Sequence, residues 1–73
     1  MAEKKEIDVL VGNRIKELLV QNGISQTEFA LMTNVAQSHI SRYLNGTVSA
    51  TLSKLQVFCK VLDITLSDLL KGI

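Results

Sequence analysis

The sequence predicts a small all-α domain built from five short helices. Apolar residues recur at three- and four-residue steps along most of the chain, which is the period of one helix face. A Ser or Thr followed three residues later by Glu or Asp occurs twice, a pattern that caps the start of a helix. The 73 residues are 47% hydrophobic and include one cysteine, so we expect one domain with an apolar core and no internal disulfide.

The first helix is expected over residues 8–22, following a flexible N-terminal arm of residues 1–7. The remaining residues, 8–73, are expected to form the single domain. The apolar stripe of this helix consists of Val11, Ile15, Leu18 and Leu19. Gly23 stands where a helix commonly ends in a left-handed residue, which sets the C-terminal boundary.

The second helix starts at a capping box. The Ser25 hydroxyl can accept the amide hydrogen of Glu28 while the Glu28 carboxylate accepts that of Ser25. The helix is expected to run to about Thr33, burying Phe29, Ala30 and either Met32 or Thr33. Asn34 then ends it, because Asn tolerates a left-handed conformation better than other residues with a side chain.

The third helix is expected from about Ala36 to Asn45, with Gly46 after it, and it has two unlike sides. At about 100° per residue, its apolar side consists of Ala36, Ile40, Tyr43 and Leu44. Its polar side gathers Gln37, Ser38, Ser41, Arg42 and Asn45, with His39 at the margin beside Tyr43. These side chains offer hydrogen-bond donors and acceptors but no carboxylate, which suits contact with a polar, anionic partner.

Two further helices complete the domain. Thr51 is expected to cap the fourth helix, whose apolar stripe is Leu52, Leu55, Phe58, Cys59 and Leu62. After a short link at Asp63 and Ile64, the capping box of Thr65 and Asp68 opens the last helix. The apolar residues of that helix are Leu66, Leu69 and Leu70.

The second and third helices together predict a DNA-binding unit. Two short helices joined by about four residues around a left-handed turn define a helix-turn-helix. The net charge is only +1, but the segment from Phe29 to Leu62 has three basic residues and no acidic one. That distribution favours an anionic partner at the middle of the chain, although chance clustering in so short a segment is the alternative.

Five short motifs follow one another along the chain: Gln26-x-Glu28-Phe29-Ala30, Thr33-Asn34-Val35, Ser38-x-Ile40-Ser41-Arg42-Tyr43, Asn45-Gly46 and Leu66-x-Asp68-Leu69-Leu70. This set resembles the Cro/C1-type helix-turn-helix family, which includes the lambdoid phage repressors. The resemblance covers roughly residues 8–71. It implies a compact five-helix, lambda-repressor-like domain that regulates transcription, as repressors do, by placing its third helix in the major groove of double-stranded DNA.

The resemblance also implies a role for each matching position. Base contacts fall on Gln37, Ser38, Ser41 and Arg42. Phosphate contacts fall on Ser25, Gln26, His39, Asn45 and Thr47. The amide of Gln matches the edge of adenine and the guanidinium of Arg matches that of guanine, while the amides at the start of a helix favour a phosphate.

The chain departs from the family pattern in four places. Asn34 replaces the usual Gly of the turn, and Ala36 replaces the Ser or Thr that usually caps the third helix. The loop after Gly46 lacks the usual cations and proline. Leu19 and Leu44 stand where phage repressors often have a buried ion pair, and we expect these two side chains to touch.

The expected partners follow from the same reading. Paired half-sites call for a homodimer, and an apolar face of Ile64, Leu66, Leu69, Leu70 and Ile73 is the expected shared surface. The 73 residues leave no room for a separate effector domain unless they are a piece of a longer regulator. The alternative function is a protein-interaction module, such as an antitoxin or an anti-regulator, that uses the same fold.

Other classes of function find no support in the sequence. No catalytic residue set, cofactor motif or metal-ligand spacing is present, so we expect no enzyme, no cofactor and no small-molecule ligand. No apolar run is long enough for a membrane span and no signal peptide is present, which predicts a cytoplasmic protein. Cys59 is expected in the core and His39 on the surface; a redox sensor and a metal ligand are the respective alternatives.

Overall fold

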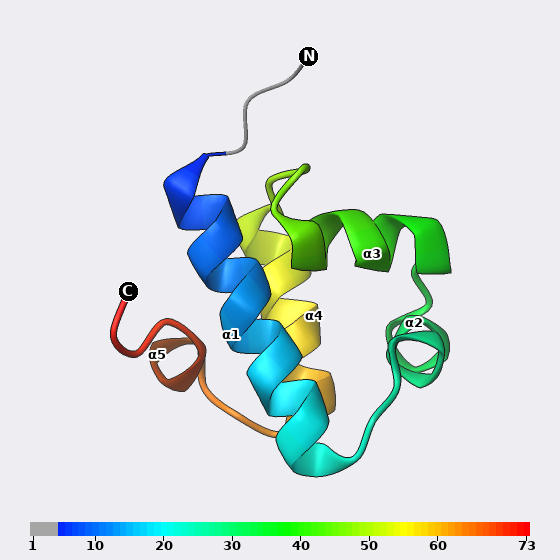
Figure 1. Cartoon of the computed structure of the whole chain (residues 1–73). Coiled ribbons are helices and arrows are strands. Elements are labelled where there is room, and N and C mark those ends of the chain that lie inside the picture. Colours follow the sequence, from blue (N-terminus) through cyan, green and yellow to red (C-terminus); the bar gives the residue numbers. More distant parts are fainter. Residues whose placement is uncertain (1–4) are drawn as a thin grey trace.

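The computed structural model describes residues 5–73 and, over that range, contains five α-helices and no strand (Figure 1). The helices are α1 (Glu6–Asn22), α2 (Gln26–Thr33), α3 (Gln37–Asn45), α4 (Leu52–Leu62) and α5 (Leu66–Leu69). No helix in the described range is both long and apolar enough to cross a membrane. The predicted all-α class and the predicted order of five helices are therefore confirmed.

The first helix begins earlier than the sequence pattern predicts. Helix α1 starts at Glu6, so Glu6 and Ile7 of the predicted arm are helical, while residues 1–4 of that arm lie outside the described residues. The first turn contains the carboxylates of Glu6 and Asp8, which stabilise the start of the helix because its N-terminal end carries a partial positive charge. Ile7 stands four residues before Val11 and so continues the apolar stripe, but it is half exposed and these two additional residues contribute little to the core.

The predicted caps and turns are present at nearly every boundary. In the α2 capping box the Glu28 amide donates to Ser25 Oγ (3.0 Å) and the Ser25 amide to Glu28 Oε1 (3.2 Å). The corresponding bonds at Thr65 and Asp68 measure 3.0 and 3.4 Å. Gly23 and Asn34 adopt the predicted left-handed conformation, and Gly46, predicted only to follow the third helix, adopts it as well. Asp63 also does so, with φ 56°, where the sequence was read only as a short link.

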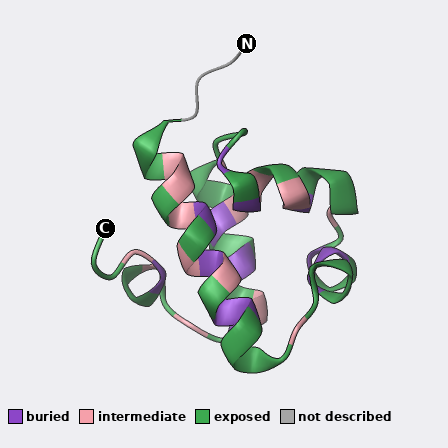
Figure 2. Cartoon of the chain, viewed as in Figure 1, coloured by how far each residue is buried: buried purple, intermediate pink, exposed green. Residues whose placement is uncertain are grey.

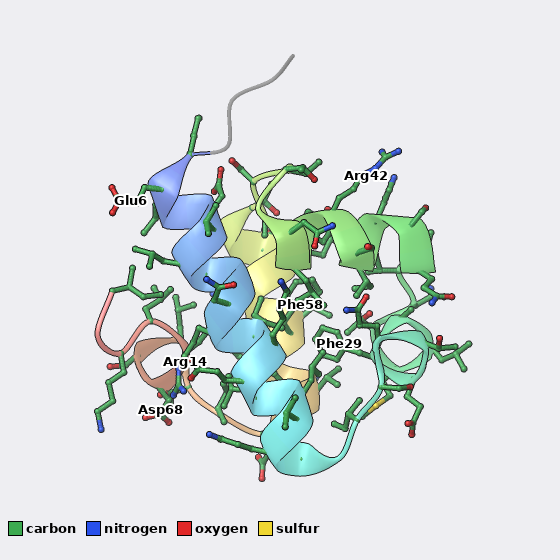
Figure 3. The ribbon with its side chains drawn as sticks, in the orientation of Figure 1. Glu6, Arg14, Phe29, Arg42, Phe58 and Asp68 are labelled. Carbon is green, nitrogen blue, oxygen red and sulfur yellow. The ribbon has the colours of Figure 1, made fainter. Side chains whose placement is uncertain are left out.

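The side chain of Phe58 lies at the centre of the core and joins three helices. Its ring centroid is 5.1 Å from that of Phe29 on α2 and 5.8 Å from that of Tyr43 on α3. Figure 3 shows the Phe29 and Phe58 side chains lying close together inside the bundle. Because tilted and edge-on aromatic pairs are favourable arrangements, Phe58 fixes α4 against both helices of the helix-turn-helix.

Three core assignments change in the structure. Leu52 was predicted in the α4 stripe but is 60% exposed at the first position of that helix, whereas Leu55, one turn later, is buried. Of the two candidates in α2, Thr33 is the buried one, and its hydroxyl donates to the Phe29 carbonyl oxygen at 2.7 Å. Leu69, predicted on the shared surface of a dimer, is completely buried within the single chain.

Helix α5 is attached to α1 by a polar contact beside the core. Arg14 Nη2 donates to the Asp68 carbonyl oxygen at 3.2 Å, and Arg14 Nη1 lies 3.4 Å from the Glu17 carboxylate (Figure 3). Nearby, burial, reinforced by the negative charge of Asp68, raises the pKa of the Cys59 thiol. A buried thiol with a raised pKa is unreactive, which supports Cys59 as a core residue rather than a redox sensor.

The start of α1 and the end of α3 approach each other at two glycines. A Cβ atom built on Gly12 would lie 2.7 Å from the Tyr43 carbonyl oxygen and would also overlap the Leu44 carbonyl. A Cβ on Gly46 would lie 2.8 Å from Val9 Cα, and Gly46 has φ 75°. Both positions therefore need glycine because backbone meets backbone there. In Figure 1 this contact is where the end of α3 reaches the upper part of α1.

Replacing Gly12 with Ala should destabilise the protein although Ala is the better helix former. The propensity gain is about 1 kcal/mol, whereas overpacking against two carbonyl groups costs about 1–3 kcal/mol or more, and neither backbone can move without shifting α3. We therefore expect Gly12→Ala to lower the urea midpoint with an unchanged m value. The exposed neighbour Asn13 provides the control, since Asn13→Ala should raise the midpoint slightly. An unchanged or higher midpoint for Gly12→Ala would contradict the close approach.

Candidate nucleic-acid interface

Helix α3 turns one side to the core and the other to solvent. Ile40 and Leu44 are 0% and 1% exposed, and Tyr43 is half-buried. Figure 2 shows the exposed residues of α3 on its outer side and the buried ones facing the bundle. The exposed residues include Gln37, Ser38, His39, Arg42 and Asn45. The predicted orientation of the polar side is therefore observed, with Ser41 at its edge because it is half-buried.

The outward side chains of α3 are available to a partner. Within residues 5–73, none of the side chains of Gln37, Ser38, His39, Ser41, Arg42 and Asn45 makes a hydrogen bond or ion pair. In Figure 3 the Arg42 side chain extends away from the ribbon into solvent. A row of unpaired amide, hydroxyl and guanidinium groups on one helix face can hydrogen-bond to base edges without first breaking internal contacts.

The turn between α2 and α3 is set by its left-handed residue. Asn34 has φ 57° and ψ 39°, and the next amide, that of Val35, donates to the Ala30 carbonyl oxygen at 3.1 Å. Ala36 then serves as the N-cap residue of α3 without a side-chain hydrogen bond, as its missing hydroxyl predicts. The angle between the two helices is thus defined by backbone bonds and by the ring of Phe58 beneath them.

The start of α2 presents a second group of predicted contacts. Ser25 and Gln26 are exposed at the N-terminus of the helix, where amide groups favour an anion. Gln26 lines a small hollow together with Lys16 of α1 and with Leu19 and Leu44. The two leucines are 3% and 1% exposed and lie in the same core cluster, as expected of an apolar pair that replaces an ion pair. Lys16, which the sequence pattern did not single out, adds a cation beside Gln26.

The loop after α3 is bound to the rest of the domain. The amide and the hydroxyl of Thr47 both donate to the Arg42 carbonyl oxygen, at 3.1 and 3.2 Å. The hydroxyl of Ser49 donates to the carboxylate of Asp8 on α1. Thr47 was predicted to contact a phosphate, but it could donate to one only by giving up one of these bonds. Its two bonds hold the loop against the end of α3, and its contact with a phosphate stays a prediction.

Formal charges around this face are sparse. Arg42 is the only cation of α3, and Lys54 and Lys60 lie on α4. Asp8 is close to the loop after α3, where it accepts the Ser49 hydroxyl. Among the described residues, no group of three or more His, Cys, Asp or Glu side chains could hold a metal ion. Contact with an anionic polymer would therefore depend on hydrogen-bond donors at least as much as on net charge.

Comparison with known proteins places this arrangement in a known group. The sequence matches the family described as Helix-turn-helix over residues 15–69. The structure is similar to the restriction-modification controller protein C.AhdI from Aeromonas hydrophila, with a TM-score of 0.85 and 25% identity, covering 89% of this chain and 98% of that one. It also resembles the clp gene regulator ClgR from C. glutamicum, with a TM-score of 0.85 and 18% identity, over 90% and 86% of the two chains.

One curated relative is of another kind. The chain is 28% identical over 60 residues to antitoxin PezA from Streptococcus pneumoniae, a match that covers 82% of this chain. The chain spans 38% of the length of that protein. The similarity therefore concerns one part of the antitoxin.

The uncapped start of α3 leads to a stability prediction. At Ala36 the backbone has φ −59° and ψ 139°, and no side chain accepts a hydrogen bond from the first turn. Ala36→Thr should supply that acceptor, whereas Ala36→Val has nearly the same shape without the hydroxyl. We expect the Thr variant to exceed the Val variant in unfolding free energy by about 1 kcal/mol. Denaturant melts of the two variants check this, and equal midpoints would show that the hydroxyl does not cap α3.

Proposed function

This chain belongs to the helix-turn-helix family, and we propose on that basis that it is a sequence-specific regulator of transcription that binds double-stranded DNA. The observation that carries the proposal is the outward side of α3, a row of unpaired polar side chains without a carboxylate. The opposite side holds the helix through the buried Ile40 and Leu44 and the half-buried Tyr43, whereas Ala36, predicted on that side, is exposed at the start of the helix. Such a helix matches the width of the major groove and the donors and acceptors in it. Family and geometry both favour a regulator over an enzyme.

The roles of individual residues follow from their position on α3. Arg42 extends away from the ribbon and suits the O6 and N7 atoms of a guanine, while Gln37 at the start of the helix suits an adenine. Ser38 and Ser41 would contact neighbouring bases, Ser41 less fully because it is half-buried. The phosphates on either side would meet the start of α2, at Ser25 and Gln26, and the flank of α3, at His39 and Asn45.

We also propose that two copies act together. One α3 helix and a net charge of +1 offer few phosphate contacts, and two copies on half-sites about one helical turn apart would double them. Of the apolar surface expected to join the copies, Leu69 is buried inside the chain and only Ile73 is exposed, at 43%. Ile64, Leu66 and Leu70 are half-buried beside it, so they could complete a contact of modest size.

An antitoxin-like or other protein-binding role is the second candidate. It is supported by the similarity to part of PezA and by two isolated apolar side chains, Val20 and Leu31, which are 81% and 79% exposed. Exposed apolar side chains mark protein contacts only when they form a continuous patch. Because the two residues lie on different helices and line different hollows, this candidate is weaker than DNA binding.

Binding to DNA selected from a random pool tests the class of function. We expect retarded complexes whose affinity falls steeply between low and moderate salt, because phosphate contacts release counterions, and whose mass corresponds to two copies per site. If no DNA sequence is selected and the chain associates with another protein independently of salt, the second candidate is favoured. A selected site occupied by one copy would leave DNA binding in place and overturn the dimer.

Replacing Arg42 tests the proposed base contact. Arg42→Ala should weaken binding to the selected site by about 1–3 kcal/mol and relax base preference at one position. The exposed Lys60 on α4 provides the matched control, since Lys60→Ala removes the same charge away from α3. Affinities of both variants for selected and scrambled DNA, measured at one salt concentration, separate base reading from general attraction. Equal losses for the two variants, with base preference intact, would remove Arg42 from the reading face.

A further inference from the structure

An exposed valine closes a small hollow on the flank of α3. The hollow has a volume of about 160 Å³ and is lined by His39, Arg42 and Tyr43 of α3 and by Val48 of the following loop. Val48 is 41% exposed, so a branched apolar side chain faces solvent directly beside the helix proposed to read DNA. The lining combines the apolar side chain of Val48 and the aromatic ring of Tyr43 with the polar groups of His39 and Arg42.

The apolar wall is held in a fixed position. On one side of Val48, both donors of Thr47 bond to the Arg42 carbonyl oxygen. On the other side, Ser49 bonds to Asp8 of α1. The opposite wall is equally constrained, because the Tyr43 ring packs edge-on against Phe58 at 5.8 Å. The hollow is therefore preformed, and a group entering it would not have to order the loop first.

The place of the hollow relative to the reading face suggests what it would meet. His39 and Tyr43 follow Arg42 around the helix, toward the loop, so the hollow lies at the margin of the row that faces the bases. In the major groove, the C5 position of a pyrimidine lies toward its own sugar-phosphate backbone. The one apolar group that the groove offers is the C5-methyl of thymine at this position.

We propose that the hollow receives the C5-methyl group of a thymine in the half-site, with Val48 as its apolar contact. This inference rests on the proposed function and makes Val48 a specificity-determining residue. His39 and Arg42 line the same hollow. In this arrangement the Arg42 guanidinium would contact the neighbouring base and His39 would contact the phosphate of the same nucleotide. A phosphate alone would contact His39 and Arg42 but would gain nothing from a valine. A thymine nucleotide would contact both these polar residues and, through its methyl group, Val48.

Uracil substitution provides the test, because uracil differs from thymine only in lacking the methyl group. Each thymine of a selected site is replaced by uracil in turn, and the affinity of the wild-type protein is measured. We expect one position per half-site to lose about fourfold, the effect of one buried methyl group. In Val48→Ala the same replacement should have little effect. Val57→Ala, which trims a valine of matching exposure (40%) on α4, should keep the wild-type response.

The outcomes separate this inference from the function on which it rests. If the protein selects a DNA site but every uracil is tolerated, or if Val48→Ala shows the full wild-type loss, the thymine contact is wrong and DNA binding stands. If no DNA site is selected, the proposed function itself fails. We expect Val48→Ala to unfold at the same temperature as the wild type, because the side chain is exposed. This control would show that the loop has kept its structure.

Discussion

The close approach of α1 and α3 at Gly12 is the constraint on which the position of the reading helix depends. Helix α3 has nine residues and one polar side, so it can be held only from beneath and from its ends. Beneath it, the Tyr43 ring contacts Phe58; at its end, the carbonyl groups of Tyr43 and Leu44 lie against the bare backbone of Gly12. A side chain at position 12 would push α3 outward and change the angle at which its polar side meets a groove.

Most of the architecture could be predicted from the sequence because most of its signals are local. A capping box, a left-handed Asn and an apolar stripe each need only a few neighbouring residues. The capping box at Ser25 and the left-handed Asn34 are confirmed, as is the α3 stripe except for Ala36, which is exposed. The errors occur at residues whose burial depends on contacts with distant parts of the chain. The exposure of Leu52 depends on which helices cover the start of α4, and the need for glycine at position 12 arises only from its contact with α3. The same holds for Val48, which only the folded loop brings beside His39.

The loop after α3 shows how the chain compensates for a shortage of positive charge. Where relatives of the phage repressor type often have cations that bind phosphates, this loop uses its polar side chains internally, on the Arg42 carbonyl group and on Asp8. The domain thereby loses general attraction to DNA but gains a rigid edge beside α3. Non-specific affinity comes almost entirely from phosphate contacts, so discrimination between sites would rest to a greater degree on hydrogen bonds and apolar contacts to bases.

The two ends of α3 are held unequally, and this difference bears on how the helix would fit DNA. Its C-terminal end is bound by the Gly12 and Gly46 contacts with α1 and by the bonded loop. Its N-terminal end begins at Ala36, which supplies no capping side chain, and carries Gln37 and Ser38 in full exposure. Contacts from the flank beside Arg42 would therefore come from the end that α1 and the bonded loop hold, whereas those of Gln37 and Ser38 would come from the end that only the backbone bonds of the turn hold. Such an interface would set its register mainly at the C-terminal half of α3, where α1 and the loop hold the helix.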